Sequence, residues 1–407
     1  MAQISRKKEY KIIMNKIKKR ILLVLDTFYP NVDGPVNSII NIGEIINANP
    51  EFNCEVEILV PYYPEPYECK NVKVHRCKSI KFGKTYRTPV PIFDSNVKKI
   101  INNGNFDLIH IHSPFTLGKA AAKLAQKNNI PTIITVHTQY KSDFERTLKS
   151  KFLQNFMMKY IMKVINMCDV VTTVSNGAKT LIRDEYRYSK SDIKVIRNGT
   201  DLKIQDINKQ ILKNAKDKYN IKNEFVFLYV GRIVENKNIQ FSLEVLKLLK
   251  EQGHNNFKFL IVGSGDYTNT LKSIINNYNL QDNVVFTGRI NNREEISAIY
   301  KCADLFMFPS TFDTCGIVVI EAAANALPSA LVENTCASEV IINRKNGLAL
   351  PQDVNVWTNE ISKIIDRKDL IVQMKEKAQK TIYVSWETIV KQYVDLYNKV
   401  IKNKNSQ

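Results

Sequence analysis

Short apolar runs alternate with helical patterns along most of this chain, and no other feature constrains the fold as strongly. In the first half, buried strands are predicted at residues 21–25, 56–60, 108–111, 132–136 and 170–174. In the second half, the corresponding runs lie at 225–230, 257–262, 284–286 and 305–308. Helical patterns are predicted at 117–126, 149–166, 239–251 and 268–279. Such βαβ alternation predicts parallel sheets that carry helices on both faces.

The length of the chain, 407 residues, suits two domains of about 200 residues each better than one core. We therefore predict an α/β protein with two doubly wound, Rossmann-like domains at 21–202 and 203–384, preceded by a basic extension at 1–20. The polar, strand-free stretch 201–223 is the predicted connection. Two such domains facing each other would place a ligand cleft at the carboxyl ends of both sheets.

Composition excludes several classes of protein. No run of about eighteen uncharged apolar residues is present, so no transmembrane helix is predicted. The basic start lacks the apolar stretch of a signal peptide. The seven cysteines are scattered and form no C-x-x-C pair, which favours reduced thiols over disulfides or a zinc site. The sequence therefore predicts a folded cytoplasmic protein.

The formal net charge of +19 admits three kinds of partner: nucleic acid, an anionic membrane or a polyanionic substrate. A compositional account is equally open, because Lys, Asn and Ile are abundant and most of the lysines are dispersed. Residues 1–20 differ from the rest, since they carry eight Lys or Arg against the single acid Glu9. Nucleic acid is disfavoured because the charge lacks interleaved aromatic residues or a known module. An anionic membrane surface therefore remains as a partner for the basic N-terminal region.

Two glycine-containing turns argue against a dinucleotide enzyme. The turn after the first strand, DTFYPNVDGPVNS, has one glycine and no G-x-G-x-x-G. The segment VGSGDYT has Gly263 and Gly265, but Thr268 stands in the place of the third glycine. No P-loop is present either. The NAD hypothesis therefore fails on its own motif.

Two cations follow a strand in the second half. Arg232 and Lys237 lie directly after the run 225–230 and just before a helix. Fixed positive charge beside a helix N-terminus suits a diphosphate, although any single R-x4-K is more often a solvated loop. Gly34, between the first strand and a helical pattern at 36–46, permits close backbone approach to an anion, or is an ordinary turn glycine.

Two carboxylates, Asp313 and Glu321, lie eight residues apart around Gly316 in STFDTCGIVVIEAAANALP. A helix is predicted from Ile317 to Ala326, with its N-terminus turned to an anionic ligand. Carboxylates accept hydrogen bonds from hydroxyls, so two of them near a diphosphate clamp indicate a nucleotide sugar. The structural alternative is an N-capping Asp313 and a surface Glu321.

Three histidines come next in order of interest. His110 and His112 are two residues apart on a predicted strand, which turns them to the same face. No third metal ligand is evident, so packing or hydrogen bonding is favoured over a metal pair. His137, at the carboxyl end of a strand, is the better candidate for a site residue.

Taken together, the motifs resemble those of the family 4 glycosyltransferases, which are retaining enzymes of the GT-B fold. The matching segments, in family order from about residue 20 to 350, include DTFYPNVDGPVNS, IHIHSP, VHTQY, VGRIVENKN, FPSTFDTCGIVVIEAAANALP and SEVIINRKNGLAL. SWETIVKQYVDLY resembles the usual final helix, which implies that 385–407 packs back toward the N-terminal domain. The set is specific, whereas any one motif alone is weak.

The resemblance implies a role for each candidate residue. Arg232 and Lys237 would bind the donor's diphosphate, together with Gly34 and the helix start at Gly316 and Ile317. Glu321 would take the ribose hydroxyls, and Thr287 and Arg289 would lie beside the base. The residues implied to act in catalysis are His137, near the reacting sugar, and Asp313, in the first position of the family's E-x7-E element.

The reaction implied is transfer of a hexose from a nucleotide-diphosphate sugar, with UDP-glucose as the leading candidate. No metal or other cofactor is required, and no D-x-D motif is present, although Mg²⁺ is compatible with the pattern. Two departures stand out: Asp313 replaces the family's glutamate, and Asp33 with Gly34 replaces two adjacent glycines. Both bear on donor choice and activity.

The acceptor is the least constrained part of the prediction. Residues 148–165, LKSKFLQNFMMKYIMKVI, combine an apolar stripe with lysines, which is typical of a helix on an anionic bilayer or of one that packs on a sheet. The resemblance includes diacylglycerol glucosyltransferases, so a membrane lipid acceptor and a peripheral location on the inner face of the plasma membrane are favoured. Alternatives are a polysaccharide, protein or small-molecule acceptor, a nucleotide-sugar epimerase and a non-catalytic subunit. The sequence does not predict the oligomeric state.

Overall fold

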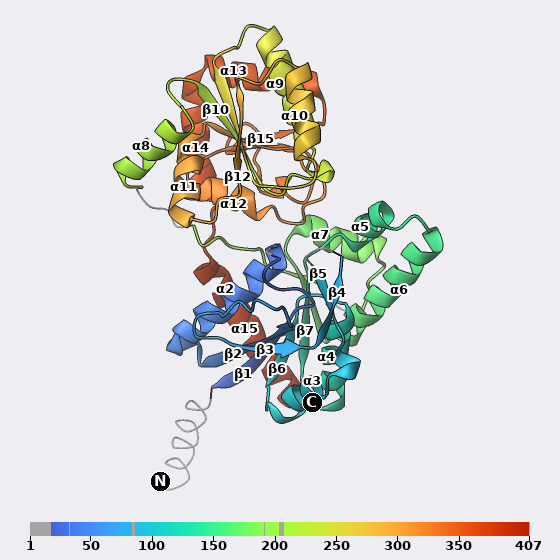
Figure 1. Cartoon of the computed structure of the whole chain (residues 1–407). Helices are drawn as coiled ribbons and strands as arrows, with labels where there is room; N and C mark the ends of the chain where they lie inside the picture. The colour runs from blue at the N-terminus through green and yellow to red at the C-terminus, as the bar shows by residue number, and fades with distance from the viewer. Residues whose placement is uncertain (1–17, 32, 84–85, 191, 203–206, 407) are drawn as a thin grey trace. The chain divides into compact units, whose positions relative to one another are not determined.

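The structure is a computed structural model, and it describes residues 18–31, 33–83, 86–190, 192–202 and 207–406. It divides into two compact units, drawn in Figure 1. The first unit comprises residues 1–198 and 386–407, and the second comprises residues 199–385. Most of the predicted basic extension, residues 1–17, lies outside the described residues. Strand β1 begins at Lys19, two residues before its predicted start.

The first unit is built on a seven-stranded parallel sheet with the strand order β3-β2-β1-β6-β7-β8-β9. Its strands are β1 (Lys19–Val24), β2 (Cys54–Pro61), β3 (Lys73–Cys77), β6 (Leu108–Ile111), β7 (Thr132–Val136), β8 (Val170–Thr173) and β9 (Lys194–Val195). The order reverses between β1 and β6, so the loops that follow these two strands open at a topological switch point. A separate hairpin pairs β4 (Ser79–Phe82) with β5 (Tyr86–Pro89).

Helices cover this first sheet. Helix α4 packs against β1, β6 and the helices α3 and α6, while α2 packs against β2 and α15. Their bounds are α2 (Gly34–Ala48), α3 (Ser95–Asn103), α4 (Thr116–Lys127), α5 (Tyr140–Thr147), α6 (Lys151–Met167), α7 (Asn176–Thr180) and α15 (Trp386–Asn405). The last helix of the chain thus belongs to the first unit, where the Tyr397 hydroxyl lies 2.8 Å from Nδ1 of His110.

The second unit has a six-stranded parallel sheet with the order β12-β11-β10-β13-β14-β15. Its strands are β10 (Phe225–Val230), β11 (Phe257–Val262), β12 (Val284–Gly288), β13 (Leu305–Phe308), β14 (Ser329–Val332) and β15 (Gly347–Leu350). Its helices are α8 (Lys209–Lys218), α9 (Ile239–Glu251), α10 (Thr268–Asn277), α11 (Arg293–Cys302), α12 (Ile317–Ala324), α13 (Val354–Asp366) and α14 (Lys368–Ile382). The switch point lies between β10 and β13.

Glycines bring the loops after β10 and β11 into contact. Gly263 has φ +141°, and a Cβ added there would lie 1.9 Å from the carbonyl oxygen of Gly231. A Cβ on Gly265 would lie 2.1 Å from the carbonyl oxygen of Ile233. These two glycines, which resemble the start of a dinucleotide motif, therefore serve close packing of backbone on backbone.

The predicted fold class is confirmed, since both halves are doubly wound parallel α/β units. Five predicted strands, β6, β7, β10, β11 and β13, match the observed bounds, and so does helix α9. The stretch 201–223 is not wholly a linker, because α8 lies within it and packs on α11 of the second unit. The units divide after Asn198, whereas the prediction placed the division after Leu202.

Candidate functional site

Except for Gly34, which lies in the first unit, the predicted donor-binding residues come from the carboxyl edge of the second unit's sheet. Arg232 and Lys237 follow β10, Arg289 follows β12, and Asp313 follows β13. Because β10 and β13 are neighbours at the switch point, the loops that follow them start side by side. Parallel strands therefore gather residues that are more than seventy positions apart in the sequence.

Lys237 and Asp313 form an ion pair across this switch point. The Lys237 ammonium lies 2.6 Å from Oδ1 and 2.7 Å from Oδ2 of Asp313, and both side chains are mostly buried. The ammonium also lies 5.5 Å from the ring centre of Phe308. An ammonium has three N–H donors, so one remains for a phosphate oxygen after two bind the carboxylate. In this arrangement Asp313 orients Lys237.

In the described part of the chain, helices α9 and α12 begin at this edge without a side-chain cap, as does α10 after β11. Helix α9 starts after Asn238, which has φ +56°, and α12 starts after Gly316, which has φ +61°. Neither helix carries an acidic residue in its first turn, so their N-terminal dipoles are not neutralised from within. A Cβ on Gly316 would lie 3.2 Å from both Ala337 Cβ and Val319 Cγ2, which explains the glycine there. Ile317, the first residue of α12, is half-buried.

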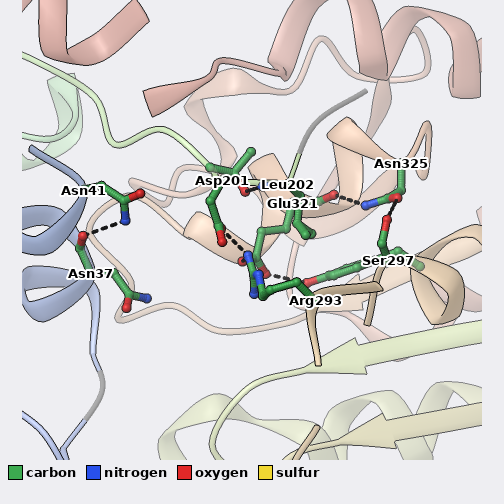
Figure 2. A network of polar contacts seen from close by, with 10 residues as sticks. Asn37, Asn41, Asp201, Leu202, Arg293, Ser297, Glu321 and Asn325 are labelled. Atoms are coloured by element: carbon green, nitrogen blue, oxygen red, sulfur yellow. Dashed lines mark hydrogen bonds and ion pairs between the residues drawn. The ribbon is translucent and has the colours of Figure 1, made fainter. Parts of the chain in front are cut away.

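Glu321 lies on α12 and is held by two residues of α11. Its Oε1 accepts a hydrogen bond from Arg293 Nη2 at 3.0 Å (Figure 2). Its Oε2 accepts one from the Tyr300 hydroxyl at 2.9 Å. Burial raises the pKa of Glu321 above its ordinary value, and the Arg293 guanidinium opposes that rise. Arg293 also pairs with Asp201. A carboxylate has about four acceptor positions, so Glu321 keeps capacity for ligand hydroxyls.

The same two helices share a further polar contact. Ser297 Oγ lies against Asn325 Oδ1, and Asn325 Nδ2 donates to the carbonyl oxygen of Glu321 at 3.0 Å (Figure 2). Arg293, Ser297 and Tyr300 have the spacing i, i+4, i+7, which aligns them on one face of α11.

The sequence interpretation missed Arg293, Tyr300 and Asp201. The signal that could have found two of them is the polar i, i+7 spacing of Arg293 and Tyr300 in NNREEISAIYKC, opposite Glu321 on α12. Asp201 carries no comparable signal, because it lies outside any helix or strand.

The remaining donor candidates are more exposed. Arg232 projects from the loop after β10, and its carbonyl oxygen accepts a hydrogen bond from the Tyr229 hydroxyl at 3.0 Å. Thr287, on β12, donates to the carbonyl oxygen of Gly288 at 2.9 Å. Arg289 is exposed directly after β12.

The three histidines of the first unit form one buried group. His112 Nδ1 lies 2.9 Å from His137 Nε2, and His110 Nε2 lies 2.7 Å from Thr135 Oγ1. Burial lowers the pKa of His137 to about 3 and holds the pKa values of His110 and His112 well below 6.5, so all three are neutral near pH 7. In the described ranges, no group of three His, Cys, Asp or Glu residues is arranged to hold a metal ion. His110 and His112 lie in a hydrogen-bonded cluster, as the packing alternative proposed.

Gly34 is the first residue of α2, and the residue before it occupies the helix start. Asp33 is the N-cap, and its carboxylate accepts a hydrogen bond from the Val36 amide at 3.0 Å. At the same edge, Asp26 accepts hydrogen bonds from the Leu117 amide at 2.6 Å and the Gly118 amide at 3.2 Å, at the start of α4. Two helix starts in this unit are therefore already occupied by carboxylates of the chain itself.

The basic amphipathic segment at 148–165 gives rise to α6, which has two different halves. Ile161 and Ile165 of its second half are buried in the core, as expected of a helix packed on a sheet. Phe152 and Phe156 of its first turns are exposed. In the ranges given above for the structure, no helix is long and apolar enough to cross a bilayer.

Comparison with known proteins identifies the family. A family model described as "Glycosyltransferase Family 4" matches residues 42–204, and one described as "Glycosyl transferases group 1" matches residues 212–381. The chain belongs to the family 4 glycosyltransferases. It is accordingly a sugar-transferring enzyme with the GT-B fold, as the resemblance implied.

Relatives with assigned activities include two named alpha-monoglucosyldiacylglycerol synthase. The one from Streptococcus pneumoniae is 29% identical over 336 residues, which cover 81% of this chain and 74% of that protein. The one from Acholeplasma laidlawii is 24% identical over 410 residues, which cover 95% of this chain and all of that protein. Among solved structures, Anabaena HepE in complex with UDP has a TM-score of 0.75 at 16% identity, covering 94% of this chain and all of that one. At that identity the likeness shows the fold alone.

Proposed function

We propose that this glycosyltransferase moves a hexose from a UDP-sugar, with UDP-glucose the first candidate, to a membrane lipid such as diacylglycerol, with retention of anomeric configuration. One observation carries the donor half of the proposal. Lys237, the uncapped starts of α9 and α12, and Glu321 with spare acceptor capacity all lie at the carboxyl edge of one sheet. This set provides cations and amides for a diphosphate and a carboxylate for ribose hydroxyls.

The proposed chemistry needs stabilisation of a leaving group. Negative charge develops on the diphosphate as the sugar departs, and Arg232, Lys237 and the helix starts, including Gly316 and Ile317, would stabilise it without reorganisation. Asp313 would hold the Lys237 ammonium at its place through the two short contacts described above. Thr287 and Arg289 would flank the base.

On the acceptor side, His137 would act as a neutral imidazole near the transferred sugar, because burial holds its pKa at about 3. The neutral ring polarises or orients a hydroxyl through a hydrogen bond rather than by full charge. Gly34, at the start of α2, would line the donor side of the first unit. The front-side attack implied for retaining members of the family requires no metal step.

Three findings support a UDP donor and a lipid acceptor. A fold neighbour was solved with UDP, and two relatives carry the name alpha-monoglucosyldiacylglycerol synthase. Helix α6 exposes Phe152 and Phe156 beside Lys151 and Lys159, which suits contact with an anionic bilayer. We therefore propose a cytoplasmic enzyme that associates peripherally with the inner face of the plasma membrane, with the basic N-terminal region as a second contact.

The test is a panel of nucleotide sugars assayed with a membrane lipid extract, scoring nucleotide release and glycolipid product. The expected result is UDP release that depends on lipid and yields a hexosyl lipid. Product sugar altered without any acceptor would indicate an epimerase, and release with a polysaccharide or protein acceptor alone would reassign the acceptor. Arg232→Ala should abolish turnover and leave the melting temperature unchanged, since the side chain is exposed. Arg344→Ala, which removes an exposed arginine paired with Glu360, is the matched control.

A further inference from the structure

The first unit carries a second concentration of exposed apolar side chains, apart from α6. Five of the twelve large hydrophobic residues exposed in the described chain lie within the fourteen residues from Ile80 to Phe93. They are Ile80, Phe82, Tyr86, Ile92 and Phe93, here called the hairpin surface. Ile92 and Phe93 are 90% and 77% exposed, and apolar side chains exposed in a cluster, unlike scattered ones, mark an interaction site.

The hairpin β4–β5 separates its apolar and basic side chains. Phe82 pairs with Tyr86 across the two strands, and Ile80 pairs with Thr88 two residues away, so the three apolar residues share a face. Lys81, which pairs with Arg87, lies on the opposite face. The turn η2 (Pro91–Phe93) follows the hairpin directly and adds its two exposed residues.

The fold holds this hairpin by its base and leaves the hairpin surface unused. Arg87 donates from Nε to Ser79 Oγ and from Nη2 to the Ser79 carbonyl oxygen, each at 2.9 Å. The Val90 amide donates to the Lys78 carbonyl oxygen at 2.8 Å. A two-stranded hairpin is marginal in water by itself, so these polar contacts fix it. None of them involves the five apolar side chains.

The base of the hairpin lies at the carboxyl edge of the first unit's sheet. Thr116, the first residue of α4, donates from Oγ1 to the Pro89 carbonyl oxygen at 2.8 Å. The same hydroxyl lies 3.3 Å from Oδ1 of Asp26, the second residue after β1. His137 follows β7 at this carboxyl edge as well. A ligand drawn to the hairpin is therefore brought to the edge that carries the candidate acceptor-side residues.

We propose that the hairpin surface inserts into the headgroup region of a lipid bilayer and so presents the lipid acceptor to this edge. The inference rests on the proposed lipid acceptor. Residues 78–93 contain four Lys or Arg and no Asp or Glu, which suits an anionic bilayer. Lysine is depleted where proteins meet proteins, so the same composition disfavours a second copy of the chain. Tyr86, with an apolar ring and a polar tip, is typical of the membrane–water interface.

Tryptophan fluorescence tests insertion directly. The chain has two tryptophans, Trp357 and Trp386, and both are buried, so neither should respond to lipid. Phe93→Trp adds an exposed reporter. We expect its emission to shift to the blue on mixing with phosphatidylcholine–phosphatidylglycerol vesicles, and brominated acyl chains to quench it. Unchanged emission would overturn the proposal. Quenching of Phe152→Trp alone would also overturn it, since α6 would then bind the bilayer without the hairpin.

Vesicle cosedimentation measures how much the exposed apolar side chains contribute to membrane binding. Ile92→Ser with Phe93→Ser should lower partition into the same vesicles by about tenfold for each side chain removed. Ile342→Ser with Val372→Ser, which removes two exposed apolar residues of the second unit, is the matched control and should have no effect. A lost dimer with unchanged vesicle binding, measured by sedimentation velocity, would assign the surface to a second copy instead.

The two proposals fail separately. Binding of UDP measured by calorimetry without lipid reports the donor site and should be equal in the wild type and in Ile92→Ser/Phe93→Ser. Vesicle insertion without any transfer to lipid would remove the lipid acceptor and leave the membrane contact standing. Transfer to lipid with no effect of the double substitution on vesicle binding would overturn the hairpin contact alone.

Discussion

Replacing Arg293 by methionine should raise the pH below which the KM for the donor increases, and so move that increase toward neutral pH. Burial already raises the pKa of Glu321, and the guanidinium 3.0 Å from its Oε1 opposes that rise. An opposite charge at such a distance lowers a carboxyl pKa by about 1–3 units. Because the Arg293 side chain is 45% exposed, we take the lower part of that range, about 1–2 units. The ionised carboxylate is a stronger acceptor for ribose hydroxyls than the protonated acid, so donor affinity falls as pH falls through the shifted pKa.

The same substitution should also change how the free energy of unfolding depends on pH. A carboxyl group whose pKa is higher in the folded than in the unfolded state does not destabilise the protein while it is protonated in both states. At higher pH it lowers the free energy of unfolding, and this loss grows as the pH rises through the folded pKa. The variant should therefore lose little stability near pH 4.5 and about 1–2 kcal/mol at neutral pH, after allowance for the half-exposed guanidinium. Urea denaturation at the two pH values measures the difference.

The assay is initial-rate nucleotide release from about pH 5 to about pH 9, with KM and kcat fitted separately. Arg293→Lys keeps a charge and should restore most of the wild-type profile. Arg344→Met removes a comparable arginine from the same unit and should leave the profile unchanged. An acid limb that coincides in Arg293→Met and the wild type would refute the electrostatic coupling, and a loss of stability without that shift would leave Arg293 a purely structural residue.

Three other perturbations test separate parts of the structure. Asp313→Asn frees the Lys237 ammonium of its counter-charge, so UDP should bind several-fold more tightly in calorimetry while kcat falls about tenfold; weaker UDP binding would contradict the orienting role. The pKa values of His110, His112 and His137 are lower in the folded than in the unfolded state. The free energy of unfolding should therefore decline below pH 6.5 by about 1.4 kcal/mol per pH unit for each histidine. Denaturation of His137→Asn should show a shallower decline. Gly263→Ala should destabilise the protein by about 3 kcal/mol or more in thermal or urea unfolding, because the added Cβ would lie 1.9 Å from a carbonyl oxygen. Gly253→Ala is the control: this glycine has φ +96° and nothing within 4 Å of the added Cβ, so the substitution should cost about 1 kcal/mol.

The elements best predicted from sequence are the buried central strands. Residues 305–308 form a continuous apolar run, and 257–262 form one interrupted only by Lys258, because both faces of a parallel strand are covered; their bounds match β13 and β11. Strands β14 and β15, four residues each, were missed because Ser329, Gly347 and neighbouring alanines give them no distinct signal. The hairpin β4–β5 was missed because its strands are exposed and lack a core face.

The sequence predicted more of the residues of the candidate site than of the contacts between them. Sequence motifs selected Lys237, Asp313 and Glu321, but spacing along a chain does not reveal a pairing between loops separated by 76 residues. The Lys237–Asp313 pair therefore emerged only from the neighbouring positions of β10 and β13. Arg293 was absent from the prediction for the same reason, since its partner lies on a different helix.

The final helix gives the chain an unusual order of assembly. Residues 386–407 complete the first unit, so the second unit is, in sequence, an insertion into the first. During synthesis residues 199–385 are therefore available to fold while His110 still lacks its partner Tyr397. Removing the last twenty residues would damage the domain that begins the protein and spare the one that precedes the cut.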